Sequence, residues 1–244
     1  MPVHALRKIL PLNMFSFARV SSEPGSYGLQ HLSKFRGLVK KNHYREKDNY
    51  YLRDMRFVVL DTETTGFKPL EGDEIISVGA CVVMGDRILP ERFHKLVNPR
   101  RPVPPVVTEL TGITDAVLEK ADGFSQVAAE LMEFLQDSII VGHSIKFDIS
   151  FLNYKLKPYG VSINNYYLDT GVLSKILNTG LRSHSLDSIL QHMSIEPAGR
   201  HTALGDALLT AGVFLRFLDR LQELKIWTLW DLRSFIRHSM LYII

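Results

Sequence analysis

The sequence predicts an α/β domain built on a mixed five-stranded sheet, with three antiparallel strands followed by parallel ones and helices on its flanks. The first observation is a set of three apolar runs in close succession, Arg56–Asp61, Glu74–Met84 and Arg87–Val97. The Gly85-Asp86 pair between the last two runs is typical of a hairpin turn. The second observation is the alternation of helical and strand patterns beyond these runs, which is typical of α/β domains with mixed sheets.

The later elements follow in order. A Pro-rich loop at Asn98–Pro105 comes after the third strand, and two further strands are expected at Ser138–Gly142 and Tyr166–Leu168. Helical patterns cover Pro105–Leu110, Thr114–Lys120, Ser125–Leu135, Asp148–Lys157, Thr170–Asn178, Ser185–Met193 and Ala203–Leu224. Thr228 and Asp231 have the spacing of a capping box, which predicts a last helix.

The segment before the first strand is expected to be an extension. Between Ser26 and Lys47, apolar residues recur at mostly three-residue spacing, which predicts an amphipathic helix. We therefore divide the chain into a basic, partly helical extension at residues 1–54, a main domain at residues 55–224 and a C-terminal helix within residues 225–244.

Composition narrows the class of protein. The chain has 244 residues, of which 45% are hydrophobic and 23% charged, a balance typical of soluble globular proteins. A lone cysteine, Cys81, cannot form an internal disulfide. No apolar run is long enough to span a bilayer, so no membrane association is expected. We expect a cytoplasmic protein, with an organellar location as the alternative because the first twenty residues are basic and lack acids.

Charge is distributed unevenly along the chain. Residues 1–54 contain ten Lys and Arg against four Asp and Glu, a net charge of +6, whereas the remaining residues carry nineteen against twenty-two, a net charge of −3. A basic segment can attract phosphate backbones. The alternative is a solvated extension without a partner.

Two acids follow the first apolar strand. Side chains two residues apart in a strand point to the same face, so Asp61 and Glu63 should present their carboxylates together. Two such anions repel each other, and a divalent cation would favour both ionised forms. Oxygen ligands suit Mg²⁺ or Mn²⁺ rather than Zn²⁺. The alternative is an Asp- and Thr-rich turn after a strand.

Two later motifs hold further candidate residues. Asp148 opens a helix after the short strand ending at Gly142, where it is either a helix cap or a metal ligand. Asp206 lies in the first turns of an apolar helix, where an unpaired buried carboxylate is costly. His201 precedes that helix on a loop. Taken singly, His201 and Asp206 are also compatible with a surface histidine and an ordinary acid at a helix N-terminus.

Together these motifs resemble those of the DEDDh exonucleases of the ribonuclease H-like superfold, close to the proofreading epsilon subunit of bacterial DNA polymerase III. The first family motif, Asp-x-Glu with a Thr-Gly turn, is matched at residues 61–66, and the second, Phe-Asp, at residues 147–148. The third, His-x-Ala-x-x-Asp-Ala, is matched at residues 201–207. The resemblance covers about residues 56–218.

The resemblance implies a 3′→5′ exonuclease that releases nucleoside 5′-monophosphates in proofreading or repair. It implies that Asp61, Glu63, Asp148 and Asp206 hold two divalent cations, Mg²⁺ or Mn²⁺, and that His201 is the general base. It also implies a cradle for the terminal nucleotide. That cradle is formed by Thr64, Thr65, Gly66, Phe67, Leu110, Gly112 and Ile113.

Alternatives remain open at this point. Nothing in the motifs separates DNA from RNA, so an exoribonuclease or oligoribonuclease is the main alternative, and a non-catalytic nucleic-acid-binding module is the other. The expected partners are single-stranded DNA or RNA 3′ ends, with a DNA polymerase subunit or a sliding clamp as further partners. The segment Gln222–Trp227 faintly resembles clamp-binding peptides, but it also fits the packed end of a helix.

Overall fold

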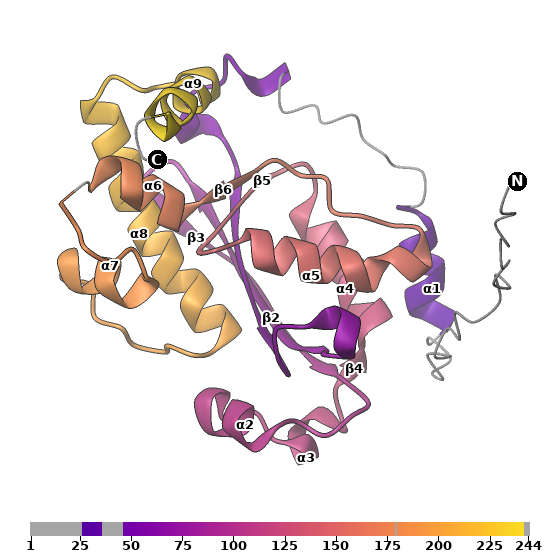
Figure 1. Ribbon diagram of the computed structural model, residues 1–244. Coiled ribbons are helices and arrows are strands. Elements are labelled where there is room, and N and C mark those ends of the chain that lie inside the picture. Colours follow the sequence, from indigo (N-terminus) through magenta and orange to yellow (C-terminus); the bar gives the residue numbers. More distant parts are fainter. Residues whose placement is uncertain (1–25, 36–45, 179, 242–244) are drawn as a thin grey trace, which may run out of the picture.

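A mixed sheet of six strands runs through the centre of the protein (Figure 1). The structure is a computed structural model, and it describes residues 26–35, 46–178 and 180–241. The strands are β1 (Phe57–Thr64), β2 (Ile75–Met84), β3 (Arg87–Asn98), β4 (Asp122–Gly123), β5 (Ile139–Gly142) and β6 (Tyr167–Asp169). Their order across the sheet is β4-β3-β2-β1-β5-β6.

The pairing confirms the predicted antiparallel and parallel halves and corrects the strand count. β1, β2 and β3 pair antiparallel, whereas β5 lies parallel to β1 and β6 lies parallel to β5. The sixth strand is β4, whose residues Asp122 and Gly123 pair with Val97 and Asn98 at the outer edge of β3. Two residues are too few to produce a periodic pattern, so the sequence did not predict this strand.

Helices cover both faces of the sheet. The α-helices are α1 (Ser26–Ser33), α2 (Pro105–Thr111), α3 (Asp115–Leu118), α4 (Phe124–Leu135), α5 (Lys146–Leu156), α6 (Thr170–Leu177), α7 (Leu186–His192), α8 (Ala203–Glu223) and α9 (Leu229–Met240). Short 3-10 helices are η2 (Leu52–Asp54), η3 (Pro69–Glu71) and η4 (Lys157–Tyr159). Across these described helices, none combines the length and the apolar character needed to cross a membrane.

Most helix boundaries agree with those expected to within two residues, and two of the differences matter here. α5 begins at Lys146, so Asp148 lies within its first turn rather than at its start. The helix expected from Ser26 to Lys47 ends at Ser33, where a turn follows at Lys34 and Phe35. Residues 36–45, which belong to the expected helix, lie outside the described residues.

The alternation of side chains along β1 divides the core into two layers. Phe57 and Val59 pack among α6, α7, α8 and α9, whereas Val58 and Leu60 pack among α1, α4 and α5. Figure 1 shows these two helix groups on opposite sides of the sheet. Any side chain that continues the first series along β1 therefore points towards α8.

The segment just before β1 and the segment before α9 meet at the first layer. Leu52 is buried there, and Tyr51 forms an isolated β-bridge with Thr228. The predicted capping box of the last helix is present, because Thr228 and Asp231 exchange side-chain hydrogen bonds with each other's backbone amides. In the segment that resembles a clamp-binding peptide, Ile226 is buried in the core and Trp227 is 44% exposed.

Candidate active site

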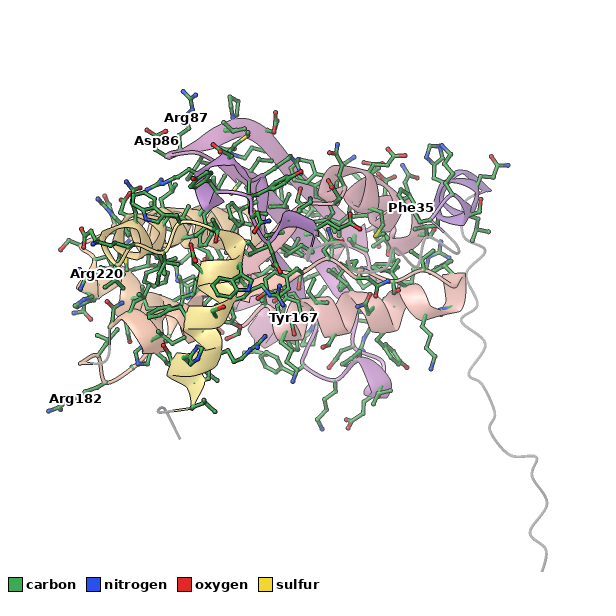
Figure 2. All side chains as sticks on the ribbon, turned by 90° about the horizontal axis from the view of Figure 1, so that it is seen from above. Phe35, Asp86, Arg87, Tyr167, Arg182 and Arg220 are labelled. Atoms are coloured by element: carbon green, nitrogen blue, oxygen red, sulfur yellow. The ribbon has the colours of Figure 1, made fainter. Side chains whose placement is uncertain are left out.

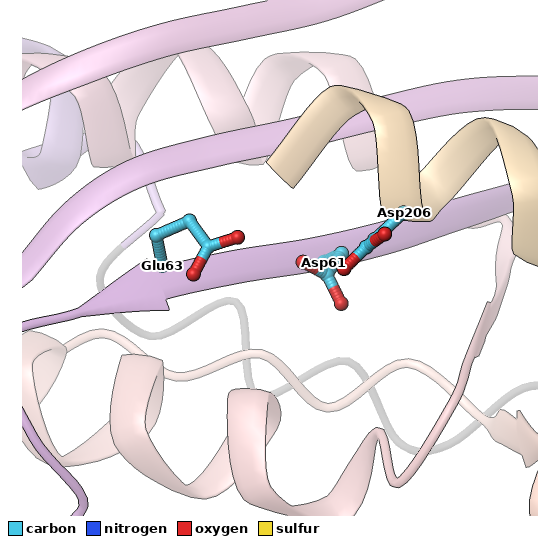
Figure 3. A group of neighbouring side chains, drawn as sticks. All are labelled: Asp61, Glu63 and Asp206. Atoms are coloured by element: carbon cyan, nitrogen blue, oxygen red, sulfur yellow. The ribbon is translucent and has the colours of Figure 1, made fainter. Parts of the chain in front are cut away.

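Asp61 and Glu63 lie at the carboxyl end of β1 and share one face of the strand. They continue the alternation of Phe57 and Val59, so both carboxylates point towards the α8 side of the sheet. Figure 3 shows the two side chains on the strand with Asp206 of α8 beside Asp61. The strand period therefore accounts for the pairing of the two acids, as the sequence predicted.

Asp206 reaches these acids because α8 begins directly over β2. Gly79 is the cross-strand partner of Asp61, and a Cβ atom at Gly79 would lie 2.2 Å from the carbonyl carbon of Ala203. Only glycine allows the first turn of α8 to approach the sheet this closely. Sequence reasoning did not single out Gly79, although a glycine inside an apolar strand is a known signal of close approach by another backbone.

Three carboxylates meet at this point. One oxygen each from Asp61, Glu63 and Asp206 lies within 4.8 Å of the other two, in a group whose Asp206 member is buried. The group thus joins side chains from a strand and from a helix that begins about 140 residues later. The sequence predicted all three residues as metal ligands.

Asp148 is held beside this group by β1. Its Oδ1 accepts a hydrogen bond from the Thr62 amide at 3.0 Å and one from the Thr62 hydroxyl at 2.6 Å. Asp148 is buried in the first turn of α5, so it approaches β1 from the other layer of the core. It is not a member of the three-carboxylate group, but its charge acts on both Asp61 and Glu63.

Burial and mutual repulsion make the carboxylates reluctant to ionise. Burial, followed by the charges of the neighbouring acids, raises the pKa of Asp61 well above its ordinary value. The same causes raise the pKa of Glu63 to about 7. Burial also raises the pKa of Asp148, against the opposing effect of its hydrogen bonds to Thr62. A bound cation would reverse this preference, because it favours the ionised form of every carboxylate around it.

One unpaired oxygen indicates that the site fits a metal ion. Asp206 Oδ1 is fully buried, and no hydrogen-bond partner for it is found among the described residues. A buried carboxylate oxygen without a partner is costly and is rare in native proteins. Because the surrounding donors are all carboxylate oxygens, the site suits a hard divalent cation such as Mg²⁺ or Mn²⁺.

His201 lies on the short loop before α8, and its φ of 62° is in the left-handed region. Thr202 ties this loop down, since its hydroxyl donates to the Gly199 carbonyl at 2.8 Å and accepts from the Gly205 amide at 3.2 Å. Within the described part of the chain, the imidazole makes no hydrogen bond to the carboxylates. His201 is thus held on the loop that leads into α8, and its charge acts on Asp187 in the first turn of α7.

The predicted nucleotide cradle consists of two segments. Thr64 and Thr65 form a closed turn with Gly66, in which Thr64 Oγ1 donates to the Gly66 carbonyl at 2.7 Å. Phe67 follows with 82% of its surface exposed, and its ring stands edge-on against Phe147 at 5.8 Å. Apolar surface this exposed beside the carboxylates is available to a ligand.

The second cradle segment comes from α2. Leu110 is 54% exposed near the end of this helix, Gly112 follows with a φ of 72°, and Ile113 is half-buried. Arg101, four residues before α2, contacts the Gly72 carbonyl and Asp73, shortly after the Thr64–Phe67 turn. The loop that leads into the second segment therefore lies against the loop that follows the first.

Sequence reasoning missed two further residues. Asp73 closes the Thr64–Phe67 turn, since its carboxylate contacts Thr65 Oγ1 at 3.1 Å and the Lys68 amide at 3.0 Å. Arg200 forms ion pairs with Asp206 and with Asp187. A basic residue directly before His201 was the only sequence signal for Arg200, and Asp73 gave none because its partners lie on the other side of a turn.

Comparison with known proteins extends the assignment. Residues 58–214 match the RNase T family model, which is described as an exonuclease. The chain is 40% identical over 176 residues to the DNA polymerase III epsilon subunit of Aquifex aeolicus, covering 72% of this chain and 85% of that protein. It is 35% identical over 188 residues, 77% of the chain, to the 3′-5′ exonuclease DinG of Bacillus subtilis.

Coverage of the relatives is unequal. The chain is also 41% identical to the Thermotoga maritima PolC-type DNA polymerase III over 77% of this chain, which is 14% of that protein. Its match to DinG covers 20% of DinG. The similarity to these two relatives therefore concerns one part of much longer proteins.

Solved structures share the fold. E. coli exonuclease I in complex with a dT13 oligonucleotide gives a TM-score of 0.61 at 18% identity, over 70% of this chain and 42% of that one. Exonuclease X in complex with 5′-overhanging duplex DNA gives a TM-score of 0.58 at 20% identity, over 74% of this chain and 99% of that one. The predicted ribonuclease H-like fold and the resemblance to DEDDh exonucleases are confirmed, and the chain belongs to the RNase T exonuclease family.

Proposed function

We propose that this chain is a metal-dependent 3′→5′ exonuclease that shortens DNA and releases nucleoside 5′-monophosphates. The observation that carries this proposal is the meeting of the Asp61, Glu63 and Asp206 carboxylates, with one oxygen of Asp206 buried and unpaired. Membership of an exonuclease family supports the same conclusion.

The residues have separate roles in the proposed reaction. Asp61, Glu63 and Asp206 would hold two divalent cations together with Asp148, whose hydrogen bonds to Thr62 fix its place beside them. When bound, such cations neutralise the phosphodiester and stabilise the attacking and leaving oxygens.

His201 is proposed to take the proton from the attacking water. The water oxygen bonds to the phosphorus of the last phosphodiester, and the bond from that phosphorus to the 3′ oxygen of the preceding nucleotide breaks. The departing 3′ oxygen takes a proton from solvent water and becomes the new 3′ hydroxyl. The exposed Phe67 and Leu110 side chains would contact the terminal nucleotide.

DNA is the preferred substrate in this proposal because the relatives include DNA polymerase III proteins, and a proofreading or repair role follows from the same relationship. RNA is retained as the second candidate, because the matching family model is named for RNase T. A DNA polymerase subunit is the proposed protein partner. The sliding clamp stays a prediction, since the buried Ile226 would have to leave the core before its segment could bind as a peptide.

The test uses 5′-labelled DNA and RNA strands of one sequence with Mn²⁺ or Mg²⁺. The DNA label should remain on a ladder of products that shorten from the 3′ end, and chromatography should identify nucleoside 5′-monophosphates. His201→Ala should slow single-turnover cleavage by about 10²–10⁴-fold. Cleavage of circular single-stranded DNA, or full activity in excess EDTA, would refute the proposal, and faster cleavage of RNA would make the second candidate the correct one.

A further inference from the structure

Arg200 connects two helices that border the candidate active site. Its side chain is 17% exposed, and Nε donates to Asp187 Oδ1 in the first turn of α7 at 2.7 Å. Its Nη1 donates to Asp206 Oδ2 in the first turn of α8. The planar guanidinium can satisfy two carboxylates at once in a fixed geometry, which a lysine ammonium cannot do.

The two oxygens of Asp206 have different environments. Oδ2 accepts the hydrogen bond from Arg200, whereas Oδ1 is buried without a partner within the described structure. A carboxylate held through one oxygen cannot rotate freely about its terminal bond. Arg200 therefore fixes the orientation of the Asp206 carboxylate, which belongs to the group formed with Asp61 and Glu63, and leaves its Oδ1 without a partner.

We propose that Arg200 is a positioning residue that orients Asp206 for metal binding, and that Asp187 acts through Arg200 by fixing its guanidinium. This inference rests on the proposed function, because it takes the three-carboxylate group to be the metal site. Residues that orient metal ligands through hydrogen bonds typically change metal affinity or activity by 10- to 100-fold when they are mutated.

A different role for Arg200 would change the metal affinity of the variant in the opposite direction. If Arg200 were a resident counter-charge that a metal ion must displace, removing it would tighten metal binding. The geometry favours orientation, because Arg200 occupies Oδ2 and leaves Oδ1 free. The direction of the change in metal affinity therefore decides between the two roles.

The experiment measures Mn²⁺ binding to the full chain without nucleic acid, by calorimetry or electron paramagnetic resonance. Arg200→Gln should weaken Mn²⁺ affinity about 10- to 100-fold. Arg200→Lys should weaken it less. Asp187→Asn should act in the same direction with a smaller effect, and it should add nothing in the Arg200→Gln background. Raising Mn²⁺ should restore part of the hydrolysis rate of Arg200→Gln.

The matched control is Arg220→Gln near the end of α8, the helix that carries Asp206. Arg220 pairs with Glu223 at 2.5 Å on the surface, and Figure 2 shows it at the rim of the molecule. This variant should bind Mn²⁺ like the wild type, and circular dichroism should show every variant folded. If Arg200→Gln proves unfolded, the effect of Asp187→Asn decides alone.

Different failures overturn different statements. Wild-type Mn²⁺ binding combined with unchanged or tighter binding by Arg200→Gln would overturn this inference and leave the proposed function intact. Absence of Mn²⁺ binding by the wild type would overturn the metal site and the inference together. Additive losses in the double variant would refute the claim that Asp187 acts through Arg200.

Discussion

The two halves of β1 form one continuous strand but differ in burial and in charge. Phe57, Val58, Val59 and Leu60 are at most 1% exposed and pack into both layers of the core. The next four residues include two acids, Asp61 and Glu63, whose pKa values burial and neighbouring charges raise. The first half stabilises the fold, whereas the second half costs stability in the absence of a cation.

This difference teaches how the site is built. The apolar half fixes the strand between two helical layers, so the acids beyond it cannot move apart to relieve their repulsion. A rigid support of this kind keeps a charged site in its working geometry at the expense of the free energy of unfolding. Changes in the two halves of β1 should consequently affect activity and stability in opposite ways.

The largest expected effect comes from neutralising an acid in the second half. Asp61→Asn should lower the rate of hydrolysis at saturating Mn²⁺ by about 10³-fold or more, since interactions that stabilise transition-state charge are worth about 10²–10³-fold each. The same change should stabilise the metal-free protein by ~0.5–2 kcal/mol, because it removes one repelling charge. Rates and denaturant unfolding in EDTA would be measured on the same preparation, and a fall in both quantities would contradict the comparison.

The next prediction concerns a truncation, which tests how far the part of the chain that stabilises the fold extends before β1. Leu32 of α1 and Leu52 are 1% and 3% exposed, although both lie within the predicted extension at residues 1–54. Deleting residues 1–54 should therefore lower the free energy of unfolding by about 3–6 kcal/mol, at roughly 1.5–3 kcal/mol for each buried side chain.

Deletion of residues 1–25 is the matched control for that truncation. It should leave the free energy of unfolding unchanged and should reduce only the salt dependence of DNA binding, because it removes three basic residues and one acid. Equal unfolding midpoints for the two truncations would place the start of the folded domain near residue 55, as the sequence predicted.

A single change in the first half of β1 should have the opposite effects to Asp61→Asn, with lower stability and a nearly unchanged rate of hydrolysis. Phe57 packs edge-on against Phe214 with ring centroids 4.9 Å apart, four residues before the acids. Phe57→Ala should lower the free energy of unfolding by about 3–5 kcal/mol. At a temperature where the variant is folded, its single-turnover rate should stay within a few-fold of the wild type. A rate loss as large as that of Asp61→Asn would show that the two halves are not separable.

Gly79 of β2 determines how closely α8, which carries Asp206, approaches the acidic half of β1. A Cβ atom at this position would lie 2.2 Å from backbone atoms of Ala203 and Leu204, so Gly79→Ala should displace the start of α8 and Asp206 with it. A misplacement of about 1 Å can cost 10²-fold in rate, and a loss of that size is expected.

The matched control for that change is Gly212→Ala, further along α8. A Cβ atom at Gly212 would meet nothing within 4 Å, so this variant should keep its activity. It should also gain about 0.4–1 kcal/mol of stability, because alanine reduces the conformational entropy of the unfolded chain. Normal activity of Gly79→Ala would show that α8 can shift without misplacing Asp206.

The sequence predicted what depends on local periodicity. The strand period placed Asp61 and Glu63 on one face, and the Gly85-Asp86 turn between two apolar runs predicted the antiparallel pairing of β2 with β3. It could not predict that Gly79 lies under α8, because the two segments are more than 120 residues apart and no local pattern records their contact. The partners of Arg200 and Asp73 are close in the sequence, but they were missed because they meet through turns and loops, for which neither the strand nor the helix period gives a signal.

The last prediction concerns the pH dependence of stability in the absence of metal. The pKa of Glu63 is raised from its ordinary value of 4.5 to about 7, and the pKa values of Asp61 and Asp148 are raised as well. A carboxyl group with a raised pKa in the folded state binds more protons there than in the unfolded chain. The contribution of these groups to the free energy of unfolding in EDTA should therefore be most favourable below about pH 4.5. It should become less favourable as the pH rises towards about 7.

Saturating Mn²⁺ should remove or reverse this trend, because a cation binds the ionised carboxylates and its binding releases their protons. Stabilisation by Mn²⁺ should therefore increase with pH over the range in which the metal-free protein loses stability. Urea unfolding at several pH values with Mn²⁺ and with EDTA would measure both trends, and Glu63→Gln should flatten the slope in EDTA. A metal-free protein that becomes more stable between pH 5 and 7, with the same slope in Glu63→Gln, would show that the acids of β1 ionise without cost and that the two halves of the strand do not differ as argued.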